Sequence, residues 1–595
     1  MKRFLSDLFS VAFLFLSLSA LFSLIWTHHI WGDVYIEQIL INMEEGVSQV
    51  SSEILKGYKI AGALAFILSF LGGFLFNKNR HLIGVGLLSS VAVFYQTGVI
   101  SYLLNQHIYS DLYEKEYVDP KNTDFVFPKE KRNLIMIYLE SMEENYANSD
   151  LVGQNLIPNL KNHQQKELHF EGFHQLRNQD YTMAAIVEGM CGIPYKRNIF
   201  QGSVGYQIFL DNAVCIPEIF RDNGYQTFFI KGASIKFART DLFLKKHGFQ
   251  DIQGALEIEK NYKLPLDENT GAFSGYQDRV LFEIAKQKLT EISKQNKPFL
   301  FEMITLDTHQ PDVYLDKKCN KVFNDDRDIV ACADKMIGDF IGWLKEQDFY
   351  SDTTIVVLGD HPETGRNALY PYEKNRRIVN FILNPAGGFE KQAHTSFTTL
   401  DFAPTILNAA GVQFKDGKFG LGRSLFQKNA TLFEKMGLAL ETELSKASHV
   451  YEKFEEGKSI NLPAYNKYEL GAKVSDLKEI EHYTVYCNII ADAVYLSDIS
   501  FRLETPPTHD LLLKVRFKTM LNNKQRRDIK VFQNGVLLET WTFGAQDKQP
   551  IEKTIRLSKD LAKDGRFFIE ILADDPFIET FSIGLMDFEV VELAE

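Results

Sequence analysis

The chain has 595 residues, of which 45% are hydrophobic, so it is too apolar for a disordered chain and long enough for several domains. Its 78 acidic residues outnumber its 65 basic residues, which gives a net charge of −13 and excludes a general electrostatic attraction to nucleic acid. Five cysteines make neither a dense disulfide scaffold nor a CxxC zinc motif. The spacings Cys191 to Cys215 and Cys319 to Cys332 would each suit a short closed loop, which composition alone does not decide.

Three apolar segments near the N-terminus predict transmembrane helices at residues 5–26, 58–76 and 82–104. Each is close to the length needed to cross a hydrocarbon core of ~30 Å. The first segment is longer than the apolar part of a signal peptide, and no cleavage site of small residues follows it. We therefore interpret it as a retained helix and residues 1–104 as a membrane anchor.

The charges beside these segments predict their orientation. Lys2 and Arg3 precede the first segment, and Lys78 and Arg80 lie between the second and the third, whereas the loop at residues 27–57 is acidic. By the positive-inside rule, everything after about residue 105 is extracytoplasmic. This predicts a multi-pass inner-membrane protein whose main domain faces the periplasm. The alternative, buried helices of a soluble domain, is disfavoured because charges occur only near the ends of the segments. In an oxidising compartment both cysteine pairs could form disulfides, leaving Cys487 unpaired.

Residues 131–430 alternate short apolar runs with amphipathic stretches, after a predicted linker at 105–130. Near-continuous apolar strands alternating with helices predict an α/β domain with a mainly parallel sheet covered on both faces. The predicted strands are 133–139, 226–230, 298–305, 353–358 and 378–383, and two of the predicted helices are 277–293 and 331–346.

Polar residues directly follow two of these strands. Glu140 follows the first strand, and Asp360 and His361 follow the fourth. Because ligands gather at the carboxyl ends of parallel strands, we expect these side chains to converge on a divalent cation. Carboxylate and imidazole ligands suit Mn²⁺, Zn²⁺ or Mg²⁺. Each residue also has a simpler interpretation, as a helix cap or as a polar surface side chain.

Thr182 directly precedes an apolar helical stretch, MAAIVEGMCGIP. A threonine at this position can cap the helix. The same position also places its hydroxyl where backbone N–H groups and the helix dipole favour a phosphate oxyanion. A metal bound beside the hydroxyl would lower its pKa and make it a nucleophile.

These segments together resemble the phosphoglycerol transferase branch of the sulfatase/alkaline-phosphatase superfamily, which includes phosphoglycerol transferase I and the lipoteichoic acid synthases. Seven segments recur in the same order, over about half of the chain. They are NLIMIYLES (133–141), IPNL (157–160), YTMAAIVEGMCGIP (181–194), KGASIKFARTDLFLKKHGF (231–249), TLDTHQPD (305–312), VVLGDH (356–361) and TTLDFAPTIL (398–407).

The resemblance implies a role for six residues. Glu140, Thr182, Asp360 and His361 match the metal ligands of the family, and Thr182 also matches its nucleophile. Arg239 and His309 match positions that contact the phosphate and glycerol of the substrate, and His309 also counts as a catalytic candidate. One metal ion is expected, with Mn²⁺ favoured and Zn²⁺ or Mg²⁺ as alternatives. The cysteine spacing resembles the same branch and implies the bridges Cys191–Cys215 and Cys319–Cys332.

The function implied is transfer of sn-glycerol phosphate from phosphatidylglycerol to an osmoregulated periplasmic glucan or another surface glycan, through a phosphoglyceryl-threonine intermediate. The alternative is a phosphoethanolamine transferase or a phosphodiester hydrolase of the same superfamily. Sulfate-ester hydrolysis is disfavoured, because Thr182 and the residues after it do not form the C/S-x-P-S-R motif of true sulfatases.

The C-terminal third predicts a different kind of fold. A connecting helical segment is expected at 431–469, followed by a β-rich domain at 470–595. Apolar and polar residues alternate with a period of two in this part of the sequence. Asn534-Gly535 lies between two apolar runs, which is typical of a β-hairpin turn. This pattern favours an antiparallel β-sandwich. Carbohydrate binding and a structural role as a lid or packing domain both remain open.

Overall fold

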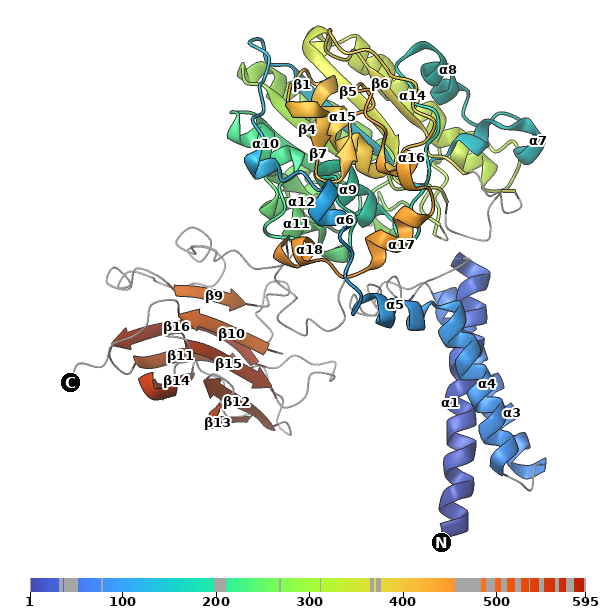
Figure 1. Cartoon of the computed structure of the whole chain (residues 1–595), viewed down its shortest axis with the longest axis vertical. Coiled ribbons are helices and arrows are strands. Elements are labelled where there is room, and N and C mark those ends of the chain that lie inside the picture. The colour runs from blue at the N-terminus through green and yellow to red at the C-terminus, as the bar shows by residue number, and fades with distance from the viewer. Residues whose placement is uncertain are drawn as a thin grey trace. The chain divides into compact units, whose positions relative to one another are not determined.

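The computed structural model divides the chain into two compact units (Figure 1). The first unit comprises Met1–Ile199 and Ala213–Phe454, and the second comprises Phe200–Asn212 and Glu455–Glu595. The structure describes residues 2–31, 36, 52–75, 79–196, 210–266, 269–310, 312–363, 369–370, 376–454, 483–487, 498–503, 511–519, 526–533, 536–544, 551–561, 567–573 and 583–592.

The N-terminal helices are α1 (Lys2–Trp31), α3 (Ser52–Leu75), α4 (Asn79–Gln96) and α5 (Val99–Asn105). Helix α1 packs against α3 and α4. A small buried apolar cluster joins the three helices and consists of Leu14, Leu18, Ala65 and Leu82. Hydrogen-bonded hydroxyls join α1 to α4 at Ser17 and Ser90, which are 3.1 Å apart. All three predicted apolar segments are therefore helical.

One described helix, Phe9–His29, is long and apolar enough to cross a membrane by length and composition. His81–Gln96 and Val99–Asn105 pass the same test only as a pair, and they are bent by 59°. The prediction of one continuous helix at 82–104 is therefore wrong. The break lies at Gly98, whose φ of 69° is a left-handed conformation that glycine adopts without strain. The break coincides with Gln96-Thr97-Gly98, a short polar interruption that the predicted segment at 82–104 included.

The part of the first unit that follows the N-terminal helices is built on a six-stranded sheet with the order β3-β2-β4-β1-β5-β6. The strands are β1 (Asn133–Leu139), β2 (Gln226–Lys231), β3 (Asp251–Gln253), β4 (Phe299–Ile304), β5 (Thr353–Gly359) and β6 (Asn380–Leu383). All neighbouring pairs are parallel except β5 and β6. The sheet is thus mixed and mostly parallel. An antiparallel edge strand is common in such sheets, and an apolar run carries no information on strand direction.

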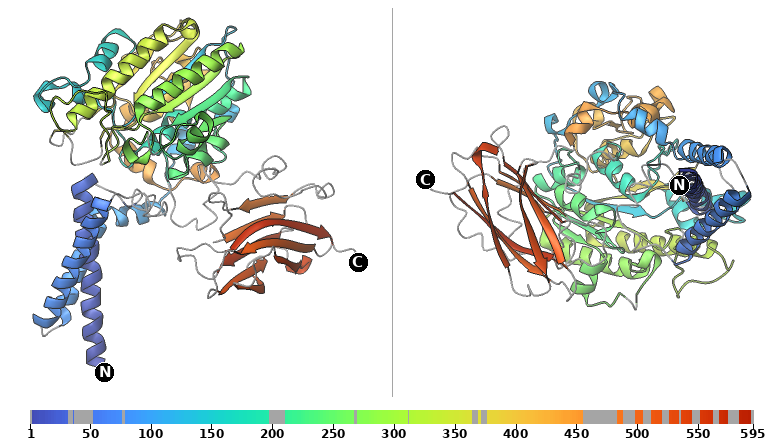
Figure 2. Two further views of the ribbon diagram at one scale, coloured as in Figure 1. Left: turned by 180° about the vertical axis from the view of Figure 1, so that it is seen from behind. Right: turned by 90° about the horizontal axis from the view of Figure 1, so that it is seen from below.

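Helices cover both faces of this sheet (Figures 1 and 2). Ile135 and Ile137 of β1 lie in one large core with Leu289 of α13 and Ile341 of α14. The opposite face of β1 meets α9, where the Tyr138 hydroxyl lies against Gly189. The helices are α7 (Ser149–Val152), α8 (Pro158–Lys166), α9 (Thr182–Cys191), α10 (Ile216–Asp222), α11 (Thr240–Lys246), α12 (Ala255–Tyr262), α13 (Asp278–Ile292), α14 (Arg327–Lys345) and α15 (Phe402–Ala409).

The segment expected to be a linker, 105–130, packs onto the domain that it precedes. It contains α6 (Leu112–Glu116), and its backbone forms isolated bridges at Val118 with Gly420 and at Val126 with Gln413. The expected connecting segment begins as three short helices, α16 (Leu432–Met436), α17 (Ala439–Ser445) and α18 (His449–Phe454). Its remainder, 455–469, lies outside the described residues.

The second unit contains two antiparallel sheets. One has five strands in the order β13-β12-β15-β10-β9, and the other has three in the order β14-β11-β16. The predicted hairpin strands pair as β12 and β13, while its turn residues, 534–535, lie outside the described part. The strands are β9 (Tyr483–Cys487), β10 (Asp498–Leu503), β11 (Leu511–Thr519), β12 (Arg526–Gln533), β13 (Val536–Gly544), β14 (Ile551–Leu557), β15 (Phe567–Ala573) and β16 (Ile583–Glu592).

Candidate active site

The structure brings Glu140, Asp360 and His361 together at the carboxyl edge of the sheet. Leu139 of β1 pairs in register with Gly359 of β5, so the residues that follow them are neighbours. The Asp360 N–H donates to the Leu139 carbonyl at 3.1 Å. One ligand atom from each of the three side chains lies within 4.8 Å of the other two, and all three residues are buried.

Backbone donors fix the Asp360 carboxylate. Its Oδ1 accepts from the N–H groups of Ser141 and His361, both at 2.8 Å. Ser141 has a φ of 51°, an uncommon conformation for a residue other than glycine, and this turn aims its N–H at Asp360. The other oxygen, Oδ2, is buried and has no hydrogen-bond partner among the described residues. A buried carboxylate oxygen of this kind is suited to a cation.

The tautomer of His361 follows from its contacts. Its Nδ1 lies 2.9 Å from the Pro362 carbonyl, which can only accept, so Nδ1 carries the hydrogen. Nε2 is then left as an acceptor, 3.3 Å from Asp360 Oδ2 and 3.7 Å from Glu140 Oε1. Three acceptor atoms that face one another repel unless a proton or a metal ion lies between them.

The same crowding shifts the pKa values of these groups. Burial and the charge of Glu140 raise the pKa of Asp360 to about 6. Burial lowers the pKa of His361, but the charges of Asp360 and Glu140 raise it more, so that it lies above its ordinary value. Both shifts indicate an excess of negative charge in a buried site, which a divalent cation would neutralise.

Thr182 is the first residue of α9, and the preceding Tyr181 is extended with a φ of −152°. The Thr182 hydroxyl donates to Glu140 Oε2 at 3.3 Å, so it points toward the acidic group. The remainder of α9 is buried from Met183 to Cys191, which holds this helix end in place. The structure therefore brings Thr182 to Glu140, one of the three clustered side chains.

Arg239 lies in a turn that approaches α9. Both Ala238 and Arg239 have positive φ values, 52° and 54°, in a tight turn before α11. The next residue, Thr240, lies with its hydroxyl 3.8 Å from the sulfur of Met183, the neighbour of Thr182. Arg239 itself is half-buried. The turn that carries the arginine thus lies near the N-terminal end of α9.

His309 follows β4 and packs against an aromatic side chain. Its ring lies 4.6 Å from the ring of Phe273, which in turn contacts Phe237 at 5.0 Å. Burial lowers the pKa of His309 to about 4, assisted by the charges of His361 and Lys231. The imidazole is therefore neutral at pH 7. Its Nδ1 is buried without a hydrogen-bond partner in the described part of the chain.

Lys231 is a candidate that the sequence reasoning missed. It ends β2, pairs in register with Ile304 of β4 and is only 7% exposed. Its Nζ lies 6.0 Å from the centre of the Phe237 ring, and its charge reaches His309. The signal was present in the sequence, because Lys231 directly follows an apolar strand in the same way as Glu140 does.

Two carboxyl groups support the loop that carries His309. Asp278, at the start of α13, accepts the N–H groups of Leu306 at 2.6 Å and Asp307 at 3.1 Å. Asp307 accepts the N–H of Asp278 in return at 3.0 Å. Burial raises the pKa of Asp278 to about 7, and burial together with the charge of Asp278 raises the pKa of Asp307 to about 9. The pair is therefore protonated in part at neutral pH.

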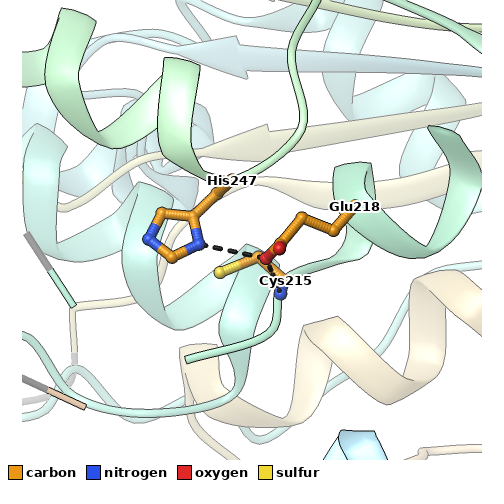
Figure 3. A group of neighbouring side chains, drawn as sticks. All are labelled: Cys215, Glu218 and His247. Carbon is orange, nitrogen blue, oxygen red and sulfur yellow. Dashed lines mark hydrogen bonds and ion pairs between the residues drawn. The ribbon is translucent and has the colours of Figure 1, made fainter. Parts of the chain in front are cut away.

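A second group of metal-ligand residue types, Cys215, Glu218 and His247, is structural (Figure 3). Cys215 is joined to Cys191 in a disulfide, so its sulfur is not available as a thiolate ligand. The Glu218 carboxylate accepts the Cys215 N–H at 3.2 Å at the start of α10, and it lies 3.1 Å from His247 Nδ1. The second implied disulfide, Cys319–Cys332, is also present.

Comparison with known proteins gives a match over the same part of the chain. Residues 132–412 match the family model of sulfatases. Phosphoglycerol transferase I of Salmonella typhimurium is 31% identical over 396 residues, which cover 63% of this chain and 50% of that protein. The chain thus spans about half the length of the curated relatives that it matches.

Solved structures with a similar fold include a protein of the alkaline phosphatase superfamily from Vibrio parahaemolyticus. It has 22% identity and a TM-score of 0.41, and the match covers 56% of this chain and 78% of that one. The lipoteichoic acid synthase LtaP from Listeria monocytogenes has 22% identity and a TM-score of 0.40, with coverage of 52% and 79%.

Proposed function

We propose that the protein is a membrane-anchored phosphoglycerol transferase, which moves sn-glycerol phosphate from phosphatidylglycerol to a periplasmic glucan or another surface glycan. One observation carries the proposal. The Thr182 hydroxyl lies at a helix N-terminus, 3.3 Å from Glu140 and beside the buried Asp360 and His361. A hydroxyl at such a position is suited to attack phosphorus while the helix end stabilises the phosphate oxygens.

The residues present fit one divalent metal ion. Glu140, Asp360 and His361 supply two carboxylates and an imidazole acceptor, and the unpartnered Oδ2 of Asp360 faces the other two groups. Together with Thr182 they would hold Mn²⁺, which we favour over Zn²⁺ or Mg²⁺ for an O-rich donor set. A bound ion would lower the pKa of the threonine hydroxyl and stabilise negative charge on the phosphate.

In the first step, Thr182 Oγ1 attacks the phosphorus of the lipid. A bond forms between this oxygen and phosphorus while the bond from phosphorus to the diacylglycerol oxygen breaks. Glu140, which accepts the hydroxyl hydrogen bond, takes the proton, and the departing diacylglycerol oxygen is protonated from solvent. Arg239 and the N–H groups at the start of α9 stabilise the phosphate oxygens. The low pKa of His309 favours a role in orienting glycerol over donating a proton.

In the second step, a glycan hydroxyl attacks the phosphoglyceryl-threonine. The new phosphate ester forms while the bond between Thr182 Oγ1 and phosphorus breaks. The proton held by Glu140 returns to Thr182 Oγ1 and restores the threonine hydroxyl, and the proton of the glycan hydroxyl is released to solvent. Because each displacement inverts the phosphorus centre, the two steps together retain its configuration. The acceptor could enter only after diacylglycerol has left, which gives ping-pong kinetics.

The proposed topology places α1, α3 and α4 across the inner membrane, with the catalytic domain in the periplasm. Support comes from the packing of α1 against both other helices. Further support comes from the basic residues Lys2, Arg3, Lys78 and Arg80, which in the sequence stand at the starts of α1 and α4, whereas the chain continues to the catalytic domain from the other end of α4. Two disulfides fit an oxidising compartment. We also propose the division into an anchor (1–104), a catalytic domain (131–430) and a β-sandwich-like domain (470–595).

Incubation of the full-length protein with phosphatidylglycerol and Mn²⁺, followed by intact-mass measurement and peptide mapping, tests the proposal. A phosphoglyceryl adduct on Thr182 is expected. Thr182→Ala should form no adduct and lose at least about 10³-fold in turnover without a change in thermal stability. Thr182→Ser should still form some adduct and keep part of the turnover, because serine also carries a hydroxyl. Removal of the metal with EDTA should also abolish the adduct, and readdition of Mn²⁺ should restore it.

Other donors give the contrasting outcomes. An adduct formed only with phosphatidylethanolamine would replace the proposal with a phosphoethanolamine transferase. Release of glycerol phosphate to water without any glycan product would indicate a phosphodiester hydrolase. Substantial transfer by Thr182→Ala would contradict the covalent mechanism.

A further inference from the structure

Helix α5 follows α4, which crosses the membrane in the proposed topology. Helix α4 has 18 residues, which makes it about 27 Å long and close to the ~30 Å of a hydrocarbon core. Thr97 and Gly98 follow, and the chain turns there by 59° (Figure 1). A helix that continued straight would leave the membrane. The bend instead inclines α5 toward the membrane surface.

One side of α5 is apolar and exposed. Ile100, Leu103 and Leu104 are 53%, 38% and 57% exposed, and Ile108, just beyond the helix, is 48% exposed. Ile100, Leu103 and Leu104 are spaced by three and four residues, which places them on one face of α5, and Ile108 follows the end of the helix. Tyr102, on the other side, is 5% exposed and faces the protein. A continuous apolar stripe in water is unfavourable and indicates a partner.

The segment after α5 is fastened to the catalytic domain. The Ala447 N–H donates to the carbonyls of Asn105 at 2.9 Å and Ile108 at 3.0 Å, and the Ser110 N–H donates to the Ala447 carbonyl at 2.9 Å. The ring of Tyr109 stacks on His449 at 4.1 Å. These contacts join α5 to α17 and α18, so the orientation of α5 is transmitted to the domain that carries Thr182.

We propose that the apolar face of α5 and Ile108 lies in the outer surface of the phospholipid bilayer and holds the catalytic domain against it. Helix α4, directly before the stripe, also exposes large apolar side chains, among them Leu88, Val91 and Phe94, which makes lipid the occupant that the geometry favours over a protein partner. An amphipathic helix of this kind buries its apolar face at the boundary between headgroups and acyl chains. The inference deepens the proposed function, because it places the enzyme at the source of a lipid donor.

Depth measurements on the full-length protein in liposomes test this placement. Leu104→Cys carries a nitroxide label in a Cys487→Ser background, so that the only reactive thiol is the introduced one. Leu88→Cys, 72% exposed in the middle of α4, marks the membrane core, and Leu256→Cys, 60% exposed on α12, marks water. The label is compared for collision with oxygen, which dissolves in lipid, and with a nickel complex, which dissolves in water.

The label at position 104 should show a depth between the two controls, near the headgroups. A value equal to that of position 256 would overturn the proposal, because α5 would then lie in water. A value equal to that of position 88 would also overturn it, because α5 would then belong to the membrane span.

Activity provides a second readout. The double variant Ile100→Gln and Leu104→Gln should raise KM for phosphatidylglycerol in vesicles by about tenfold while leaving kcat unchanged. Turnover of a water-soluble glycerophosphodiester should not change, and Leu256→Gln should affect neither donor. Equal losses with both donors would contradict a lipid-docking role. A wild-type protein that acts on neither donor would instead overturn the proposed function, and the depth measurement would stand independently.

Discussion

The acceptor atoms of Glu140, Asp360 and His361 lie so close together that a proton or a cation is needed between them. Asp360 Oδ2 and His361 Nε2 are 3.3 Å apart, and in the neutral tautomer of His361 no hydrogen lies between them. The sequence offers a reason to place these residues together, because Glu140 directly follows β1 and Asp360 and His361 are the first two residues after β5. The same reasoning applied to basic residues would have found Lys231, which the search for metal ligands passed over.

Lys231 should control the protonation of His309. Its replacement in Lys231→Met removes a nearby positive charge, so the pKa of His309 should rise from about 4 toward its ordinary value. The rise should be partial, because burial is the larger cause of the depression. NMR titration of histidine-labelled protein, with the signal assigned by His309→Gln, measures it. Lys335→Met, on the exposed face of α14, is the matched control, and an unchanged His309 titration would refute the contact.

At the level of secondary structure, the end of β5 is shaped by a glycine. A Cβ at Gly359 would lie 2.1 Å from the Met142 carbonyl oxygen, and Met142 in turn accepts from Val379 at 3.0 Å. The close approach of these two backbones brings Asp360 next to Glu140. The sequence motif VVLGDH contains this glycine, but the clash that explains it becomes visible only in three dimensions.

Gly359→Ala should therefore destabilise the domain by about 3 kcal/mol and weaken Mn²⁺ binding, because Asp360 must shift with the backbone. Gly342→Ala provides the control, since nothing lies within 4 Å of a Cβ at that position in α14. This control should be neutral or stabilising by up to about 1 kcal/mol. Thermal unfolding and Mn²⁺ titration measure both effects. If both variants had the same melting temperature and the same affinity for Mn²⁺, the close approach of the backbones at Gly359 would not determine stability or metal binding.

The loop between β4 and α14 depends on the carboxyl pair Asp278 and Asp307, whose pKa values are raised to about 7 and about 9. The folded protein therefore holds a proton that the unfolded chain loses above its ordinary carboxyl pKa near 4. The contribution of this pair to the free energy of unfolding is fully present below pH 4 and is lost as the pH rises through 7 to 9. The slope is up to about 1.4 kcal/mol per pH unit for each proton retained on folding.

Asp307→Asn should flatten this dependence between pH 5 and pH 9, because the amide does not titrate. The melting temperature of the wild type should fall over the same range by more than that of the variant. Asp339→Asn, whose carboxylate is exposed on α14, should keep the wild-type slope. A variant that retains the full slope would assign the dependence to other groups.

For the whole molecule, the candidate site belongs to one unit. All six candidate site residues lie within Met1–Ile199 and Ala213–Phe454. They are Glu140, Thr182, Arg239, His309, Asp360 and His361. A chain ending at Phe454 should therefore still form the phosphoglyceryl adduct on Thr182, as measured by intact mass, even if glycan transfer declines. Loss of the adduct from a chain that still unfolds cooperatively would show that the β-rich part completes the site.

The sequence predicted the architecture most accurately where patterns are local. Strands β1, β2, β4 and β5 and the start of α9 lie within a residue or two of their expected bounds, since burial on both faces produces unmistakable apolar runs. The direction of β6 could not be predicted in the same way, because it depends on how the chain connects in space, which hydrophobicity does not encode. The break at Gly98 did have a local signal, since Gln96, Thr97 and Gly98 interrupt the apolar run there.

The disulfide Cys191–Cys215 joins the last residue of the helix that Thr182 begins to the start of α10. Disulfides form and persist in oxidising compartments. In the proposed topology this bond would form only after the domain has left the cytoplasm. If Thr182 is the nucleophile, the helix that carries it would gain this constraint only after export, and lipid headgroups of the inner leaflet would not meet the fully constrained enzyme.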